Sequence, residues 1–176
     1  MTVAAASRPD ATEFASFYAG YVALVPEGDI VNILRRDGDA WQSVLAELPD
    51  ARGDHRYAEG KWTIRQLVGH VSDAERIFAY RALRIARGDQ TPLASFDENA
   101  YAETAGSDRR TLSALAAELR VVRESTVALL SSLPDDAWTR TGTASDKTVS
   151  VRALAYITAG HAEHHLKILR ERYLGL

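Results

Sequence analysis

The sequence predicts an all-α fold, a four-helix bundle with long crossover connections and a short N-terminal helix. Four long segments repeat apolar residues at helical spacing, and none of them alternates apolar and polar residues as a half-buried strand does. A length of 176 residues suits one such bundle. We therefore interpret residues 1–176 as one domain that starts with a loose arm at residues 1–11.

The first half of the chain contains a short helix and two long ones. Aromatic residues within residues 13–26 indicate a short helix that docks on the bundle and stops at a proline. The first long helix covers residues 29–48, between a capping aspartate and a proline. The second covers residues 63–87, because Thr63 and Gln66 have the spacing of a capping box and a glycine follows the last turn.

The second half alternates long connections with long helices. Residues 89–107 form a long connection, which we expect to wall a pocket. The third long helix is expected at residues 108–132, and an irregular crossover with a few extended residues follows at 135–149. The last helix begins after the capping Ser150 and continues to about residue 173.

Composition excludes several classes of function. A net charge of -3 provides no excess of positive charge for a phosphate backbone, so no nucleic acid partner is expected. No apolar run approaches the roughly 20 residues that cross a bilayer, so we expect no membrane partner and a cytoplasmic location. The chain has no cysteine, so a metal ion must be held by nitrogen and oxygen, and any thiol must come from outside.

Two histidines in the last helix are the most informative residues. His161 and His165 lie one turn apart, near the middle of an apolar stripe where leucines are expected. Buried imidazoles need partners for their ring nitrogens, and two neighbouring ones disfavour charge on both. A metal ion would satisfy both rings, but hydrogen bonds inside the bundle would also do so. The pair alone therefore leaves both interpretations open.

A third ligand would decide between them, and His70 is the candidate. It lies at the flank of the apolar face of the second long helix, and metal sites in bundles are built from facing helices. The sequence does not prove that these two helices face each other. His164 falls toward the edge of the stripe and is expected at a pocket rim, although it is also an alternative ligand. His55 lies in a polar loop and is given no role.

Glu75 maps inside the apolar face of the second long helix. An inward carboxylate could be a catalytic proton acceptor, a hydrogen-bond partner of a ligand, or one half of an ion pair with an arginine such as Arg81. The ion pair is the favoured interpretation, and the catalytic role is kept as a candidate.

Two segments resemble the DinB/YfiT-like superfamily of metalloenzymes, namely KWTIRQLVGHVSDAERIFAYRALRIARGD and GHAEHHLKILRERY. The stretches FYAGYVALVPEGD and FDENAY are also similar, so the resemblance spans nearly the whole chain. It implies a bundle with a long crossover, frequently dimeric, in which His70, His161 and His165 bind one divalent ion, Zn²⁺ or Ni²⁺. Some relatives use a low-molecular-weight thiol as cosubstrate.

Three histidine ligands would leave part of the coordination sphere open, as in catalytic metal sites. The sequence therefore predicts a metal-dependent enzyme acting on a small molecule, either a hydrolase that activates water or an S-transferase that activates an external thiol. A homodimer is expected from the resemblance. The alternative is a non-catalytic helical module that binds a metal or another ligand.

Overall fold

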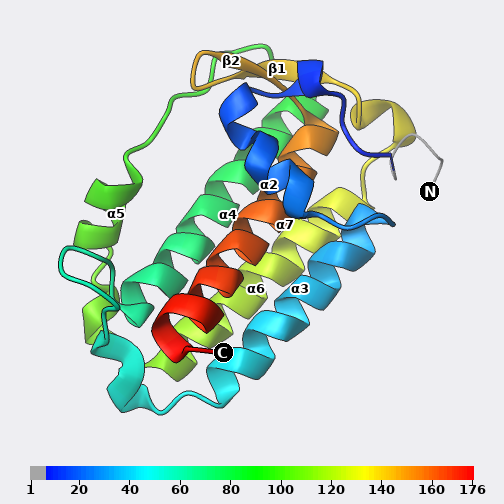
Figure 1. Cartoon of the computed structure of the whole chain (residues 1–176). Helices are drawn as coiled ribbons and strands as arrows, with labels where there is room; N and C mark the ends of the chain where they lie inside the picture. Colours follow the sequence, from blue (N-terminus) through cyan, green and yellow to red (C-terminus); the bar gives the residue numbers. More distant parts are fainter. Residues whose placement is uncertain (1–6) are drawn as a thin grey trace.

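A computed structural model describes residues 7–176 as a bundle of long helices (Figure 1). The long helices are α3 (Ile30–Ala46), α4 (Ile64–Ala86), α6 (Leu112–Ser131) and α7 (Val151–Ile168), which continues into a π-helical turn (Leu169–Leu174). The shorter elements are α2 (Ala19–Leu24), α5 (Glu98–Thr104), β1 (Thr141–Ala144) and β2 (Lys147–Ser150). Single 3₁₀ turns lie at Ala11–Glu13, Ser16–Tyr18, Asp50–Asp54, Ser107–Arg109 and Asp135–Ala137. The predicted four-helix bundle is confirmed.

The order of the long helices around the bundle differs from their order in the chain. α4 packs against α6 and α7, and α3 packs against the same two helices, so α3 and α4 lie diagonally opposite each other. α6 and α7 are the other diagonal pair. The connections from α3 to α4 and from α6 to α7 therefore cross the bundle, as the predicted crossovers require. Figure 1 shows that α3 and α7 run in one direction while α4 and α6 run in the other.

The predicted caps form in the structure. The Asp29 side chain accepts a hydrogen bond from the Asn32 backbone, and the Ser150 hydroxyl accepts one from Ala153. Thr63 and Gln66 form both halves of the capping box at the start of α4. These bonds satisfy backbone N–H groups that an uncapped helix would leave unpaired.

The two long connections contain structure that the hydrophobic pattern did not indicate. α5 lies within the predicted connection 89–107, where the Asp97 side chain caps its first turn. The third long helix begins at Leu112, later than predicted, because Thr111 supplies its cap and a separate 3₁₀ turn precedes it. The crossover 135–149 holds the β1–β2 hairpin, whose register pairs Ala144 with Lys147.

The N-terminal arm is attached to the bundle from residue 7 onward, and residues 1–6 of the predicted loose arm lie outside the described part of the chain. Arg8 donates 2.6 Å hydrogen bonds to the carbonyl oxygens of Val22, within α2, and of Val25, which follows α2 directly. Glu13 accepts hydrogen bonds of 2.7 Å from Ser150 and from Arg152 at the start of α7. The arm therefore holds α2 against α7. That residues 1–176 form one domain stays a prediction.

Buried apolar side chains form two groups along the bundle axis. One lies at the hairpin end and includes Ile30, Leu34, Ile85, Trp138 and Tyr156, and the other lies toward the C-terminus and includes Trp41, Leu67, Leu119 and Leu166. None of the helices within residues 7–176 has the length and apolar character needed to span a membrane.

Candidate metal centre

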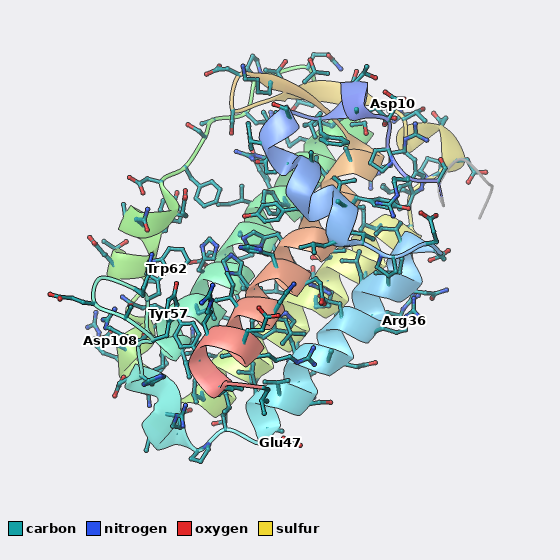
Figure 2. All side chains as sticks on the ribbon, in the orientation of Figure 1. Asp10, Arg36, Glu47, Tyr57, Trp62 and Asp108 are labelled. Carbon is teal, nitrogen blue, oxygen red and sulfur yellow. The ribbon has the colours of Figure 1, made fainter. Side chains whose placement is uncertain are left out.

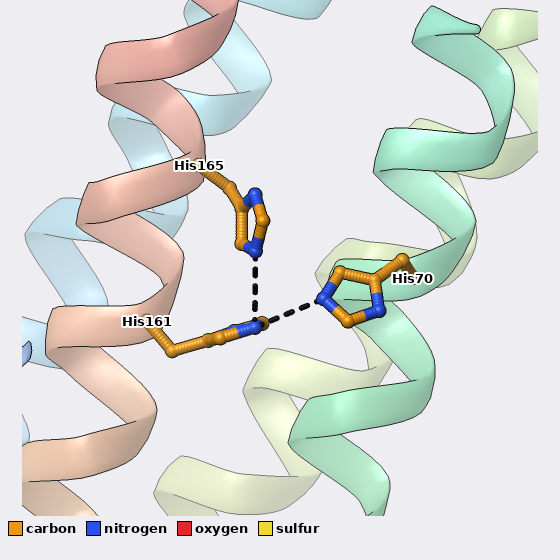
Figure 3. A group of neighbouring side chains, drawn as sticks. All are labelled: His70, His161 and His165. Atoms are coloured by element: carbon orange, nitrogen blue, oxygen red, sulfur yellow. Dashed lines mark hydrogen bonds between the residues drawn. The ribbon is translucent and has the colours of Figure 1, made fainter. Parts of the chain in front are cut away.

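Three histidine side chains converge between α4 and α7 (Figure 3). The Nε2 atom of His161 lies 3.0 Å from that of His70 and 3.1 Å from that of His165. One ligand atom from each ring lies within 4.8 Å of the others, and the three side chains are buried. The structure therefore brings together all three residues that the sequence proposed as ligands.

The helices explain why the rings meet. His161 and His165 are one turn apart on α7, so both rings leave the same face of that helix. α4 packs directly against this face and supplies His70 from its second turn. Gly160 precedes His161, and a Cβ atom there would lie 1.9 Å from the Tyr21 carbonyl oxygen. The missing side chain thus lets α2 approach α7 closely beside the histidines.

Burial keeps the three imidazoles neutral. It lowers the pKa of His70 to about 4 and, together with the neighbouring His70 and His164, lowers the pKa of His165 to about 3. Burial and then the neighbouring His165 and His70 hold the pKa of His161 well below its usual range. Each ring can therefore present a lone pair at neutral pH without first losing a proton, which is the form that binds a metal.

The donor set fits a divalent cation. A neutral Nε2 atom has either one N–H or one lone pair, so His161 cannot make a full hydrogen bond to both neighbours from that atom. A single cation between the rings would accept all three lone pairs. Tetrahedral nitrogen ligands at 2.0–2.1 Å from zinc lie about 3.3 Å apart, close to the two separations of 3.0 and 3.1 Å from the His161 Nε2 atom. Among residues 7–176 the His165 Nδ1 atom has no hydrogen-bond partner, so no bond on that side fixes the ring.

Aromatic side chains surround the histidines. The Trp62 ring centroid lies 4.5 Å from that of His70, and the edges of Tyr21 and Phe78 face His161 at 5.4 and 5.6 Å. The histidines line one wall of a cavity of about 370 Å³. Phe96, from the connection 89–107, lines the same cavity, as the sequence led us to expect for this segment.

His164 and His55 are outside the cluster. His164 is partly exposed, and its ring packs against Tyr21 with a centroid separation of 5.3 Å. Of the described residues, only the three buried histidines form a group of candidate ligands whose ligand atoms converge, and His164 is not part of that group. His55 lies in the loop before α4, where its ring faces Tyr173.

Glu75 is buried in an ion pair, but its partner is Arg123 on α6 and not Arg81. Arg123 donates from Nε and Nη2 to the two Glu75 oxygens at 2.8 and 2.9 Å, and from Nη1 to Asp37 at 2.7 Å. α6 passes between α3 and α4, which places Arg123 between the two carboxylates. Arg81 instead donates to the Ala94 carbonyl and the Ser145 hydroxyl. This geometry favours the ion-pair interpretation of Glu75, whose catalytic role stays a prediction.

The sequence interpretation assigned no role to three other aromatic residues of the cavity wall. Tyr18 and Tyr21 come from the N-terminal segment and Trp62 from the loop before α4, and all three line the same cavity as the histidines. Figure 2 shows Trp62 in that loop, on the side of the bundle where α5 lies. The connection of these residues to the site depends on how the two segments fold back onto the bundle. The only local signal was the density of aromatic residues at positions 14–21.

The fold and the histidine cluster define a helical bundle with a candidate three-nitrogen metal centre. Residues 33–169 match the model of the DinB superfamily, and the chain belongs to that family. A Bacillus pumilus (strain SAFR-032) protein, named for an inferred metal-dependent hydrolase activity, is 28% identical over 158 residues, which cover 82% of this chain and 89% of that protein.

YfiT of Bacillus subtilis (strain 168), with a name of the same kind, is 26% identical over 154 residues, covering 80% of this chain and 86% of YfiT. A solved structure of YfiT from Bacillus subtilis, described as an unusual four-helix bundle, superposes with a TM-score of 0.73 at 20% identity. The match covers 94% of this chain and 90% of that one. This match shows the shared fold.

Proposed function

We propose that this protein is a metal-dependent hydrolase of a small molecule and that His70, His161 and His165 bind one divalent ion. The observation that carries the proposal is the convergence of three neutral Nε2 atoms in the wall of a cavity. Three protein ligands leave coordination positions open, as in catalytic sites and unlike closed structural sites. The names of the two Bacillus relatives favour hydrolysis over other metal-dependent reactions.

The histidines and the aromatic cavity wall would have different roles in the reaction. When bound, a divalent ion supplies Lewis-acid activation of water or of an external thiol. The histidines would hold it, and the rings of Trp62 and Phe78 would reduce the access of bulk water to the cavity. Zn²⁺ or Ni²⁺ suits ligands that are all imidazole nitrogen. The homodimer and the cytoplasmic location stay predictions.

Thiol-dependent S-transfer is the second catalytic reaction that the same centre would support. It requires a thiol from outside, because the chain contains no cysteine. A non-catalytic binding module is the third possibility, and it predicts ligand binding without turnover.

The test is a panel of esters and amides incubated with protein loaded with Zn²⁺ or Ni²⁺. Each substrate is measured with and without glutathione, mycothiol or bacillithiol, and His161→Ala is compared with His164→Ala on the same helix. The proposal predicts thiol-independent cleavage that His161→Ala abolishes and His164→Ala retains. Turnover only with a thiol would establish the transferase, and metal binding without any turnover would favour the binding module.

A further inference from the structure

The cavity beside the histidines extends along one face of α4 to Arg81. About three turns of helix, a rise of about 16 Å, separate His70 from Arg81, and both residues line the same cavity. The Arg81 guanidinium marks the hairpin end of the cavity, where it binds Ser145. The wall between the two ends is aromatic and consists of Phe17, Tyr18, Tyr21, Trp62, Phe78 and Phe96.

Arg81 differs from the other buried arginines of the described chain. Arg65 is paired with Asp50 and Asp54, and Arg123 is paired with Glu75 and Asp37. Arg81 is only 3% exposed, yet no carboxylate within residues 7–176 lies within salt-bridge distance of it. A buried charge without a counter-ion is unfavourable, and such groups are retained where a ligand supplies the opposite charge.

Neutral groups hold the Arg81 guanidinium in place. Its Nη2 atom donates to the Ala94 carbonyl at 2.7 Å and to the Ser145 hydroxyl at 3.0 Å, and the Tyr18 hydroxyl lies nearby in the same cavity wall. Ser145 has a left-handed backbone, with φ of 52°, at the turn of the β1–β2 hairpin. A guanidinium has five N–H donors, so these two bonds from Nη2 leave the donors on Nε and Nη1 for a ligand.

The other charged residue of the cavity wall does not neutralise Arg81. Glu98, at the start of α5, is exposed, and it lies near enough to Tyr18 and Tyr21 to raise the pKa of both hydroxyls, although burial is the larger cause. The cavity thus has one buried cation at one end, three neutral imidazoles at the other and one carboxylate exposed to solvent.

We propose that Arg81 is a substrate-binding residue that recognises a carboxylate at the end of the cavity opposite the histidines. The inference rests on the proposed hydrolase function and specifies its substrate class: an elongated organic acid with an apolar or aromatic middle and an ester or amide at its far end. Two free N–H donors in one plane match the two oxygens of a carboxylate. The aromatic wall accommodates the middle of the molecule.

A binding experiment tests whether Arg81 recognises a carboxylate, and it does not require turnover. The probe is 4-phenylbutyrate, and its neutral amide, 4-phenylbutanamide, has the same shape without the charge. Both are titrated into chelator-treated protein and followed by calorimetry and by the Arg Nε–Hε signals in the NMR spectrum. The wild type is expected to bind the acid at least tenfold more tightly than the amide, with a shift of the Arg81 signal.

Variants separate recognition by Arg81 from a general charge effect. Arg81→Gln is expected to reduce the preference for the acid to less than threefold, and Arg81→Lys to retain part of it. Arg87, the exposed C-cap residue of the same helix, is the control position. Arg87→Gln makes the same change in net charge and is expected to keep the preference. Equal binding of acid and amide by the wild type, or an unmoved Arg81 signal, would overturn the proposal even if Arg81→Gln does not fold.

Kinetics then distinguish failure of this inference from failure of the proposed function. With metal-loaded protein, Arg81→Gln is expected to raise KM at least tenfold for ethyl esters that carry a distal carboxylate. For matched ethyl esters in which a neutral carboxamide replaces that carboxylate, kcat/KM of the variant is expected to stay within threefold of the wild-type value. Hydrolysis of both classes with equal kcat/KM would overturn the role of Arg81 while the hydrolase stands. Selective binding of 4-phenylbutyrate without hydrolysis of any ester would support the role of Arg81 in binding and contradict the hydrolase function.

Discussion

The Nε2 atoms of His70 and His161 lie 3.0 Å apart although 91 residues separate the two histidines in the chain. This contact joins α4 to α7, which are neighbours in the bundle but are separated in sequence by α5, α6 and the hairpin. A binding site made this way depends on the fold, because neither helix provides three ligands alone. Changes that move α7 relative to its neighbours should therefore affect the site as well as stability.

Gly160→Ala tests the close approach of α2 to α7. The new methyl group would overlap the Tyr21 carbonyl oxygen, so the backbone of α2 must shift. We expect a loss of about 1–3 kcal/mol in the free energy of unfolding and a change in the Tyr21 ring contact with His161. Urea unfolding and the His161 NMR signals measure the two effects.

Gly20→Ala is the matched control for that variant. Gly20 lies on α2, and a Cβ atom there meets no atom within 4 Å. The control is expected to be neutral or slightly stabilising, because alanine favours helix over glycine by about 1 kcal/mol. If Gly160→Ala behaved like Gly20→Ala, α2 would not be packed against α7 as described.

Glu75→Gln tests the buried ion pair. Arg123 would lose its bidentate partner inside the bundle, and breaking such a pair from one side costs about 3–5 kcal/mol. Glu124→Gln, on the exposed side of α6 beside Arg123, should stay within about 0.5 kcal/mol of the wild type. Urea unfolding of both variants provides the comparison. A Glu75→Gln protein as stable as the wild type but without activity would favour the catalytic role.

Asp37 should make stability depend on pH in an unusual direction. Burial, opposed by attraction to Arg123, raises the pKa of Asp37 from 3.8 to about 6. The folded protein therefore holds this proton more tightly than the unfolded chain, so the contribution is complete below pH 3.8 and is lost as the pH rises through 6. The amide introduced by Asp37→Asn would imitate the protonated acid, so this variant should gain up to about 3 kcal/mol relative to the wild type between pH 4 and 8.

Urea unfolding of wild type and Asp37→Asn across that pH range measures the difference. The two stability curves should separate most steeply at about pH 5, midway between the unfolded and folded pKa values of Asp37, where the two states differ most in bound protons. Parallel curves would mean that the Asp37 carboxyl has an ordinary pKa and that the ion pair with Arg123 offsets its burial completely.

The sequence predicted the helices better than the contacts between them. Periodic apolar residues and the caps at Thr63 and Ser150 were sufficient to locate α4 and α7, because these signals are local. α5 was not predicted, and the hairpin was expected only as a few extended residues in the crossover 135–149, since short elements have too few residues to establish a period. The pairing of α4 with α7 depends on crossovers that no local pattern specifies.

The same distinction applies to the candidate site. All three converging histidines were proposed from their positions on helix faces. The family resemblance implied in addition that they bind one ion together. An ion pair of Glu75 with an arginine was expected, and Arg81 was given as an example of the partner, whereas the structure pairs Glu75 with Arg123 on α6. Arg81 could be recognised as a buried arginine without a carboxylate only once the positions of α6 and the hairpin were known.

The metal content of the purified protein is the most direct test of the proposed three-histidine metal centre. Wild type, His161→Ala and His164→Ala are purified without chelator, equilibrated with Zn²⁺ or Ni²⁺, desalted and measured by inductively coupled plasma mass spectrometry, with helix content checked by circular dichroism. We expect one ion per chain in the wild type and in His164→Ala, and a loss of at least tenfold in His161→Ala while it remains helical. Equal metal in folded His161→Ala and wild type, or none in either, would contradict a centre built from His70, His161 and His165.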